Sequence, residues 1–373
     1  MDSLLLEFWF DKELLDDSSK LDNFLCDLSK QLKSNFNNLS VLTEKKSDAK
    51  QCGFVMLYQM DSSCTILVQG TGQGLLTIDV HAFSEKTWFN EETVQELRNK
   101  IFEIKSIKQR KTMEFKSLLP IKRGRSFTPY DTLSTGYLVE YDFDELVFDQ
   151  DSPYQNVRIL HSNQFGNCLV LDNDINLAES DLAYTVAITG DNKEDYTGKD
   201  VLVLGGGDGG ILNYLRDKGP SMITMIDIDR VVIDAAKIHL RGICGDSMDE
   251  EEGKNYKIIV DDCVKHLVEF TKAGRKFDYV INDLTAIPIS KEPVGSHWDF
   301  LRLILSLSLD VLKDDGKYFT QGNGSLNIRN LKMYEDVLKS LKTPVNFSKQ
   351  TVGVPSYMEL WVFYTLRKTK DTA

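Results

Sequence analysis

The sequence predicts an α/β fold class, with a mostly parallel β-sheet in the C-terminal half of the chain. Four apolar β-forming residues, 201–204, lead into a glycine-rich turn, 205–210, and then into apolar residues at helical spacing. From residue 179 onward, strand-like and helix-like patterns alternate, which is typical of a parallel sheet with helical crossovers. The patterns before residue 179 are different and predict two further units ahead of this sheet.

The length and composition fit a globular protein of several domains. The chain has 373 residues, of which 42% are hydrophobic and 27% are charged, so it can form sizeable cores. We predict an N-terminal α+β domain at residues 1–115, a small antiparallel β domain at 116–178 and an α/β catalytic domain at 179–373.

The N-terminal domain mixes both kinds of pattern. Helical spacing occurs at residues 21–32 and 94–104, with strand-like segments between them at 54–58, 64–68 and 74–82. No catalytic constellation is present in this part, so we expect a structural or assembly role. A basic stretch follows, formed by Lys105, Lys108, Arg110, Lys111, Lys116, Lys122, Arg123 and Arg125. It lacks interleaved aromatic residues, and this favours a solvated linker over a surface for an anionic partner.

The middle segment predicts a small sheet of hairpins. Its short strand-like runs, 137–141, 146–148, 157–161 and 168–171, are separated by turn-forming residues at 164–167 and 172–174. In the C-terminal domain, the glycine turn is followed by expected strands at 222–228, 256–260, 279–281, 317–320, 346–352 and 360–364, with helices at 231–240 and 300–312. An acidic segment at 246–252 is expected to be a solvated connection.

The charge and the cysteine pattern exclude several classes of protein. A net charge of −13 argues against a nucleic-acid binder or a protein of anionic membranes, and it suits cationic substrates. The six cysteines and five histidines are scattered, so we expect free thiols and no zinc or other metal site. No signal peptide and no apolar run of spanning length is found, which predicts a soluble, cytosolic protein.

Acidic residues recur where the predicted parallel strands end. Asp208 lies in the glycine turn, Asp227 near the end of the second strand, Asp262 after the third and Asp283 after the fourth. The carboxyl ends of parallel strands meet at one edge of a sheet, where ligands bind. Such an acidic cleft is unfavourable unless a cation occupies it. For Asp262, a helix N-cap is an alternative interpretation that stays open.

The charge of Asp208 narrows the choice of ligand. A carboxylate in this turn repels a pyrophosphate or an amino-acid carboxylate and attracts an amine. S-adenosylmethionine carries a carboxylate beside its amine, whereas its decarboxylated form carries only a sulfonium and an ammonium. The sequence therefore favours transfer of an aminopropyl group over transfer of a methyl group.

Several ordered motifs between residues 136 and 364 resemble the polyamine aminopropyltransferase family. These motifs are 152–155, 165–167, 205–210 and 282–285. Two more, Asn176–Tyr184 and Val354–Trp361, are similar to those of the spermine synthases within the family. The resemblance implies a Rossmann-like, methyltransferase-type catalytic domain. It also implies that residues 1–115 form an S-adenosylmethionine decarboxylase-like domain that makes a homodimer, although no motif in that part indicates this independently.

The resemblance also implies roles for individual residues. For the nucleoside, Gln155 would contact it, Asp227 would hold its ribose and Asp262 would receive the adenine amino group. Asp208 would bind the aminopropyl ammonium, and Asp283 would be the general base. Spermidine would be held by Tyr184, Asp208, Tyr357 and Glu359. One departure is that the ribose position is usually glutamate in this family, and here it is Asp227.

The activity that the resemblance implies is spermine synthesis. Decarboxylated S-adenosylmethionine would be a co-substrate, not a bound cofactor, and would donate its aminopropyl group to spermidine. Spermidine synthesis from putrescine, methyl transfer and an inactive dimerising homologue are the alternatives. Among the residues, Asp278 is a second candidate for the base, although it resembles a turn residue at a strand start. Tyr184 and Tyr357 could be ordinary half-buried aromatics, and Glu359 an exposed edge charge.

Overall fold

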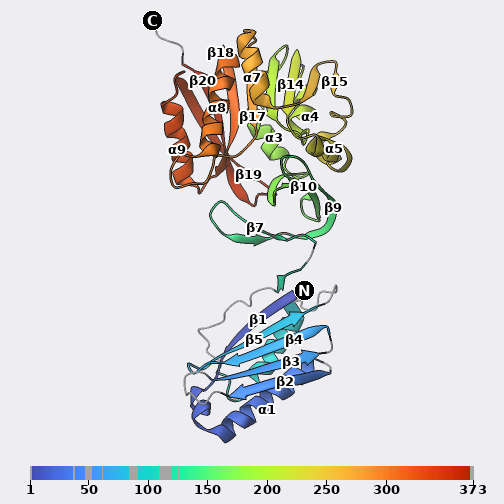
Figure 1. Ribbon diagram of the computed structural model, residues 1–373, viewed down its shortest axis with the longest axis vertical. Coiled ribbons are helices and arrows are strands. Elements are labelled where there is room, and N and C mark those ends of the chain that lie inside the picture. Colours follow the sequence, from blue (N-terminus) through green and yellow to red (C-terminus); the bar gives the residue numbers. More distant parts are fainter. Residues whose placement is uncertain are drawn as a thin grey trace. The chain divides into compact units, whose positions relative to one another are not determined.

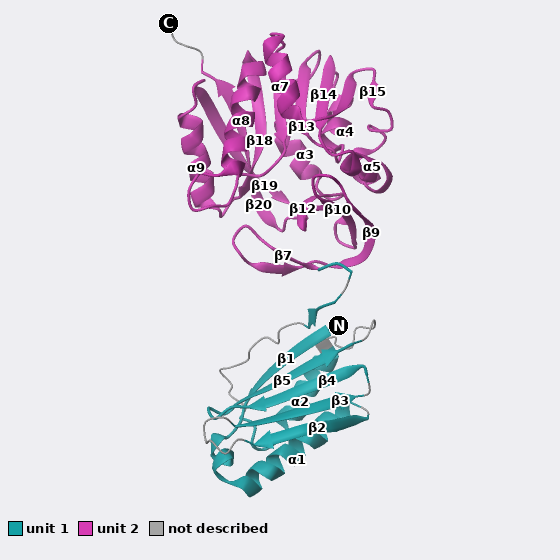
Figure 2. Cartoon of the chain, viewed as in Figure 1, with its two compact units in different colours: residues 1–128 teal, residues 129–373 magenta. Residues whose placement is uncertain are grey.

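The structure is a computed structural model of the 373-residue chain, and it describes residues 2–36, 38–46, 53–60, 62–83, 91–108, 120–124 and 126–369. The chain divides into two compact units, residues 1–128 and 129–373 (Figure 2). Most of the basic stretch, at 109–119 and 125, lies outside the described residues. No helix among the described ranges is long and apolar enough to cross a membrane.

The N-terminal unit is an antiparallel sheet with helices packed against it. The sheet has the strand order β2-β3-β4-β5-β1-β6. Its strands are β1 (Asp2–Trp9), β2 (Leu39–Lys46), β3 (Phe54–Met60), β4 (Cys64–Gly70), β5 (Leu75–Ala82) and β6 (Ile121–Lys122). The helices of this unit are η1 (Lys12–Asp16), a 3-10 helix, and α1 (Ser18–Asn35) and α2 (Glu91–Phe102).

One face of this sheet forms a core with the helices. Alternate residues of β3, β4 and β5 are buried, as expected of strands with one covered face. The buried apolar stripe of α1 packs against the same core, and Phe24 stacks on Phe10 with ring centroids 5.5 Å apart. On the other face, Leu5 and Val55 are each 37% exposed.

The C-terminal unit begins with two small antiparallel sheets. A separate hairpin is formed by β7 (Tyr130–Thr132) and β8 (Leu138–Glu140), and β7 lies apart from the main sheet in Figure 1. A second sheet has the order β12-β11-β10-β9. Its strands are β9 (Phe143–Asp151), β10 (Asn156–Ser162), β11 (Gly166–Leu171) and β12 (Asp174–Ala178).

The rest of this unit is built on an eight-stranded sheet with the order β15-β16-β14-β13-β17-β18-β20-β19. Its strands are β13 (Asp200–Gly205), β14 (Met222–Asp227), β15 (Glu252–Gly253), β16 (Tyr256–Val260), β17 (Phe277–Asp283), β18 (Leu312–Gly324), β19 (Val345–Val354) and β20 (Glu359–Lys368). The helices are α3 (Leu182–Ile188), α4 (Gly210–Arg216), α5 (Arg230–His239), α6 (Arg241–Cys244), α7 (Cys263–Lys272), α8 (Ser296–Val311) and α9 (Ile328–Lys339).

Helices cover both faces of the large sheet, which confirms the predicted α/β fold class. In β13, Val201 and Val203 pack with α3, α4 and α5, whereas Leu202 and Leu204 pack with α7, α8 and α9. A strand buried on both faces is expected to be a continuous apolar run, as this one is. The chain goes from β13 to β14 on one side and later returns to β17 on the other side of β13. This change of direction opens a crevice at the carboxyl ends of the strands.

Several elements differ from the sequence prediction. The sequence prediction placed no strand at the N-terminus, yet Ser3 to Trp9 lie within β1, and it did not predict β2, α3, α7 or α9. The last parallel strand, β18, is longer than the predicted segment 317–320. The acidic connection is exposed and carries ion pairs, such as Arg230 with Glu251 and Arg241 with Asp249.

Candidate active site

A cavity of about 1020 Å³ lies at the carboxyl ends of β13, β14, β16 and β17. The parallel register brings Gly205 beside Asp283 and Asp227 beside Val260, so the ends of these strands form one edge. The residues to which the family resemblance gave roles all line this cavity: Gln155, Tyr184, Asp208, Asp227, Asp262, Asp283, Tyr357 and Glu359.

The glycine turn allows the backbone to pass close to the end of β17. Gly205 has a φ of 80°, and a Cβ atom at this position would lie 2.3 Å from the carbonyl oxygen of Asp283. Glycine is therefore required there on both conformational and steric grounds. The turn then carries Asp208 into the cavity, where its Oδ1 accepts a hydrogen bond of 2.7 Å from the backbone N–H of Gly210.

The carboxylate of Asp227 is held by the backbone around it. Its Oδ2 accepts a 2.9 Å hydrogen bond from the N–H of Gly207, and its Oδ1 accepts one of 2.9 Å from the N–H of Asp229. The short side chain thus ties the end of β14 to the glycine turn. Each carboxylate oxygen has a further lone pair with which it can accept a hydrogen bond from a ligand.

Asp283 and Asp208 form a half-buried acidic pair. Burial raises the pKa of Asp283 to about 7, the charge of Asp208 adds to the increase, and the hydrogen bond from Tyr184 acts against it. Burial likewise raises the pKa of Asp208 to about 6, with a contribution from the charge of Asp227. Both shifts have the causes expected of carboxylates that are shielded from water and lie close to one another.

Tyr184 is a hydrogen-bond donor to this pair. Its hydroxyl group donates to Oδ1 of Asp283 across 2.5 Å. Burial, followed by the charge of Asp283, raises the pKa of the Tyr184 phenol, so the phenol keeps its proton. The ring also packs edge-on against Tyr357, with centroids 6.0 Å apart. Tyr184 is therefore part of the carboxylate site and more than a packing aromatic.

Asp262 both caps a helix and lines the cavity. It is the N-cap of α7, because its Oδ1 accepts a 2.9 Å hydrogen bond from the N–H of Val264, and it also lines the cavity. The structure therefore confirms that Asp262 is a helix N-cap. Its carboxylate also remains accessible at the cavity wall. The N-cap bond engages one oxygen of the side chain.

Gln155 is positioned by a polar cluster that begins at the end of β9. Its Nε2 donates to Oδ2 of Asp229 across 3.0 Å, and the hydroxyl group of Ser152 donates to the same oxygen across 2.7 Å. Asp229 also caps α5 through the N–H of Val231. Asp229 was not singled out from the sequence, although an aspartate directly before a helical pattern is a signal for an N-cap.

Tyr357 and Glu359 lie on the turn between β19 and β20 and at the start of β20. The hydroxyl group of Tyr357 donates to the carbonyl oxygen of Asn176 across 2.6 Å. Both carboxylate oxygens of Glu359 accept hydrogen bonds from Ser134 in the β7–β8 turn: Oε1 from the N–H at 3.1 Å and Oε2 from the hydroxyl group at 2.6 Å. Glu359 is thus a partly buried, bonded side chain and not an exposed edge charge.

The turn that carries Tyr357 is fixed by a buried aspartate that sequence reasoning missed. Asp181 is 1% exposed, and its Oδ1 and Oδ2 accept hydrogen bonds from the N–H and the hydroxyl group of Ser356. Its Oδ2 also accepts from the N–H of Ala178 across 2.8 Å. The hydroxyl group of Tyr141 donates to the carbonyl oxygen of Ser356 on the same turn. No local pattern marks such a long-range partner.

The cavity contains two further carboxylates that sequence reasoning missed. Asp131 and Asp174 line it, the first on β7 and the second at the start of β12. Burial and the charge of Glu359 raise the pKa of Asp131, and burial and the charge of Asp131 raise the pKa of Asp174. Asp174 was read as part of a turn, and Asp131 lies on a strand too short to be seen as a pattern.

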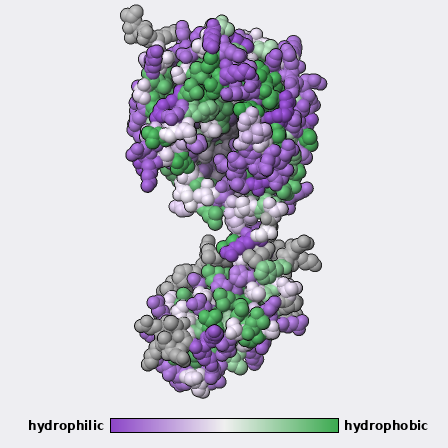
Figure 3. Space-filling view, viewed as in Figure 1, coloured by the Kyte–Doolittle hydropathy of each residue, from purple (hydrophilic) through white to green (hydrophobic). Residues whose placement is uncertain are grey.

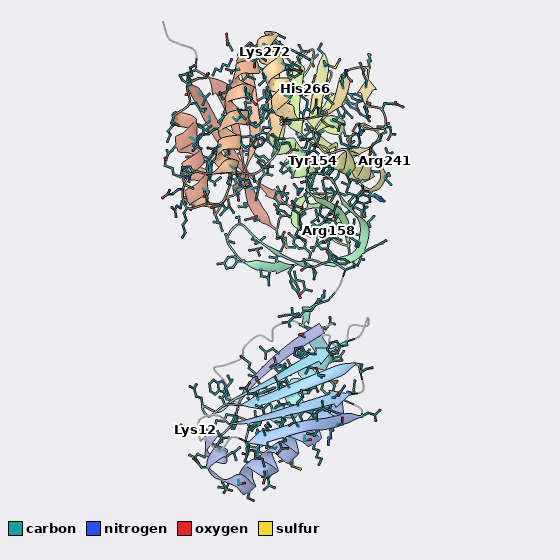
Figure 4. The ribbon with its side chains drawn as sticks, viewed as in Figure 1. Lys12, Tyr154, Arg158, Arg241, His266 and Lys272 are labelled. Carbon is teal, nitrogen blue, oxygen red and sulfur yellow. The ribbon has the colours of Figure 1, made fainter. Side chains whose placement is uncertain are left out.

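The described residues that line the cavity include no lysine and no arginine. Hydrophilic side chains cover large parts of the face shown in Figure 3, but the side chains labelled in Figure 4 on this unit that can carry positive charge, Arg158, Arg241, His266 and Lys272, are not among the lining residues. The site is therefore negative and has room for a cationic ligand.

Asp278, the second candidate for the base, lies at the other end of β17. It pairs with Lys313 at 2.8 Å and with Lys199 at 3.6 Å, and it accepts from the N–H of Asp200. Burial acts to raise the pKa of its carboxyl group, but these partners outweigh it and the pKa is lowered. Asp278 does not line the cavity and is a structural residue.

Two domain families match this chain. Residues 181–373 match the spermine/spermidine synthase domain, and residues 127–179 match the spermidine synthase tetramerisation domain. The N-terminal match ends, and the C-terminal match begins, between β12 and α3.

Individual proteins show the same similarity. A protein of Pyrococcus abyssi named polyamine aminopropyltransferase is 31% identical over 243 residues, which cover 61% of this chain and 80% of that protein. A protein of the same name from Thermococcus onnurineus is 29% identical over 239 residues, covering 61% and 77%. The crystal structure of spermidine synthase from Thermotoga maritima has a TM-score of 0.52 at 17% identity and covers 71% of this chain and 85% of that one. The structure of a spermidine synthase in complex with the transition state analogue AdoDATO has a TM-score of 0.53 at 19% identity, and the match covers 67% of this chain and 83% of that one. Both structures are similar to this chain in fold.

Proposed function

Because this chain belongs to the spermine/spermidine synthase family of polyamine aminopropyltransferases, we propose that it is a spermine synthase. In the proposed reaction, the aminopropyl group of decarboxylated S-adenosylmethionine is transferred to spermidine, and the products are spermine and 5′-methylthioadenosine. The donor is consumed as a co-substrate, so the proposal includes no bound cofactor.

The observation that carries this proposal is that one cavity contains two separate clusters of carboxylates. Asp208 lies in the glycine turn and Asp283 at the end of β17, whereas Glu359, at the start of β20, is bonded to the β7–β8 hairpin, and its charge acts on Asp131, which in turn acts on Asp174. An acceptor with amines along its length needs negative charge at more than one place. Spermidine has an additional amine that putrescine lacks, and Glu359 is the residue we assign to it.

The chemistry asked of the site is positioning and deprotonation. The terminal amine of spermidine attacks the aminopropyl carbon next to the sulfonium, the carbon–sulfur bond breaks, and the electron pair goes to sulfur. Asp283 takes the proton that the attacking nitrogen loses as its bond to carbon forms. The sulfonium is already an activated leaving group, so alignment of donor and acceptor provides the remaining acceleration.

The other residues are assigned to binding. Asp208 pairs with the ammonium of the aminopropyl group, Tyr184 and Tyr357 place the amines, and Asp262 and Gln155 contact the nucleoside. Asp227 holds the ribose through the lone pairs that its bonds to Gly207 and Asp229 leave over. A role for Asp278 is not part of this proposal.

The proposal extends to assembly and location. The match of residues 127–179 to a tetramerisation domain supports self-association of the chain. We propose a homodimer made by the S-adenosylmethionine decarboxylase-like N-terminal domain, residues 1–115, and a cytosolic location. The partly exposed Leu5 and Val55 on the uncovered side of the N-terminal sheet support the proposed homodimer.

The runner-up function is spermidine synthesis from putrescine. Incubation of the protein with decarboxylated S-adenosylmethionine and each polyamine in turn, followed by product identification, separates the two. We expect a preference for spermidine of at least about a hundredfold, because putrescine leaves the Glu359 carboxylate unpaired. Glu359→Gln is expected to raise the KM for spermidine far more than that for the donor. A preference of the wild type for putrescine would leave spermidine synthesis as the function.

A further inference from the structure

The β7–β8 hairpin forms one wall of the cavity. Asp131, Thr132, Leu133 and Ser134 all line it. Among the strands that the structure describes, β7 and β8 pair only with each other, and their turn is closed by backbone hydrogen bonds between Leu133, Gly136 and Tyr137. At the tip, Tyr137 is 70% exposed, so this end of the hairpin is not held by a core.

Ser134 connects this hairpin to the proposed acceptor site. Its N–H and its hydroxyl group donate to the two different oxygens of Glu359, at 3.1 and 2.6 Å. Such a two-point contact fixes the plane of a carboxylate. Without it, the glutamate side chain has several rotatable bonds and samples many orientations.

The contact depends on a glycine in the neighbouring strand. A Cβ atom on Gly324, at the end of β18, would lie 2.0 Å from Oγ of Ser134 and 2.4 Å from Oε2 of Glu359. No side chain fits between these groups. The absence of a side chain at Gly324 thus gives Ser134 and Glu359 the space in which they meet.

We propose that Ser134 is a positioning residue that orients the Glu359 carboxylate toward the distal ammonium of the acceptor, and that the β7–β8 hairpin thereby takes part in selecting acceptor length. This inference rests on the proposed function. Ser134 contacts the substrate only through Glu359. A carboxylate held by two donors still has lone pairs for an ammonium group, and its orientation is set before the acceptor arrives.

The same geometry explains why the effect is specific for the longer acceptor. A diamine that reaches only Asp208 and Asp283 does not use Glu359. Loss of the Ser134 contact therefore leaves its binding unchanged. Nor does it affect the chemical step, because the base and the glycine turn are on other elements.

The test uses the full-length protein, with steady-state kinetics for spermidine, putrescine and the donor. Ser134→Ala removes the hydroxyl group and keeps the backbone N–H. We expect the KM for spermidine to rise about five- to tenfold, because a hydrogen bond to a charged group is lost. The kcat with saturating spermidine and the KM values for putrescine and donor should change less than about twofold. Ser134→Thr retains a hydroxyl group and should restore most of the affinity.

Two controls separate positioning from general damage. Thr135→Ala changes the adjacent, exposed residue of the same turn and should leave all constants unchanged. In a Glu359→Gln background, Ser134→Ala should add less than about twofold to the KM for spermidine, because the two residues act as one unit.

The outcomes for this inference and for the proposed function are distinct. A wild type that uses spermidine, together with an unchanged KM in Ser134→Ala, overturns the role of Ser134 alone. Equal increases for spermidine and putrescine also overturn it, since the hairpin then acts on the whole site. A wild type that does not convert spermidine overturns the proposed function, and this inference with it.

Discussion

The carboxyl group of Asp283 is set to change its charge near neutral pH. Burial raises its pKa to about 7, so the basic form that the proposed mechanism needs becomes populated as the pH rises through this value. We predict that kcat/KM for spermidine increases with pH and levels off above an apparent pKa near 7, because this parameter reports groups of the free enzyme. A pH–rate profile between pH 5.5 and 9, taken at roughly constant ionic strength, measures it.

Asp283→Asn is the matched variant for this profile. It keeps the shape and removes the proton acceptor, so kcat should fall by roughly a hundred- to ten-thousand-fold while the nucleoside still binds. The variant should also lose part of the pH dependence of stability. Buried carboxyls with raised pKa values bind more protons when folded, which makes the folded state less stable as the pH rises from about 4 to 7. Near-normal turnover of the variant would remove Asp283 from the proposed mechanism.

Asp208 is predicted to distinguish donor from product by charge. Only the donor presents an ammonium to the turn, whereas methylthioadenosine does not. Asp208→Asn should therefore weaken donor binding by roughly ten- to a hundredfold and methylthioadenosine binding by much less. Calorimetry with both ligands measures the difference. Equal losses would mean that Asp208 shapes the turn, through its bond to Gly210, and does not recognise charge.

At the scale of elements, the turn between β19 and β20 depends on Asp181. This buried carboxylate accepts from Ser356 twice and from Ala178, so Asp181→Asn turns an amide N–H₂ toward groups that donate. We predict that the free energy of unfolding falls by about 2–3 kcal/mol, which lowers the Tm by roughly 5–10 °C for a unit of this size. Thermal unfolding followed by circular dichroism measures the change.

Asp314→Asn is the control for the Asp181 variant, since the side chain of Asp314 is 98% exposed. Its Tm should stay within about one degree of the wild type. If Asp181→Asn unfolds at the same temperature as this control, the turn is held by other contacts, of which the bond from Tyr141 to Ser356 is the nearest.

The sequence predicted elements whose pattern is local. The run into β13 is apolar on both faces, and the glycines after it are required by their backbone, so both were visible from residue types alone. No helix was predicted at α7, although Asp262 was considered as a possible N-cap and does cap this helix. No element was predicted at β1, and nothing local shows that this strand pairs with β5, far along the chain.

The residues of the candidate site likewise fall into those that local sequence predicts and those that it does not. Carboxylates at strand ends were predictable because parallel strands place their carboxyl ends together. Ser134, Asp131 and Asp181 were not, because their partners lie far away in sequence and are brought near only by the fold. The contact between Glu359 and the β7–β8 hairpin also could not be predicted, because it joins residues far apart in the sequence.

At the scale of the whole molecule, the units are expected to separate function from assembly. The described residues that line the cavity all belong to the C-terminal unit, which has its own cores. We predict that a chain lacking residues 1–115, to which the dimer is assigned in our proposal, keeps donor binding within about threefold and sediments as a monomer. Analytical ultracentrifugation of both chains measures this, and a shortened chain that remains a dimer would assign the dimer contact to the C-terminal unit.

The absence of lysine and arginine from the described lining of the cavity has a consequence for how fast substrates arrive. A polyamine carries several positive charges, and a chain with a net charge of −13 attracts it before contact. Such attraction raises association rates and is screened over about 8 Å at physiological ionic strength. At low acceptor concentration the reaction should therefore slow as salt is added, with kcat unaffected. Multivalent cations in the medium would compete with the polyamine for the negative site. The reaction rate at low acceptor concentration would therefore depend on the concentrations of all free cations in the solution.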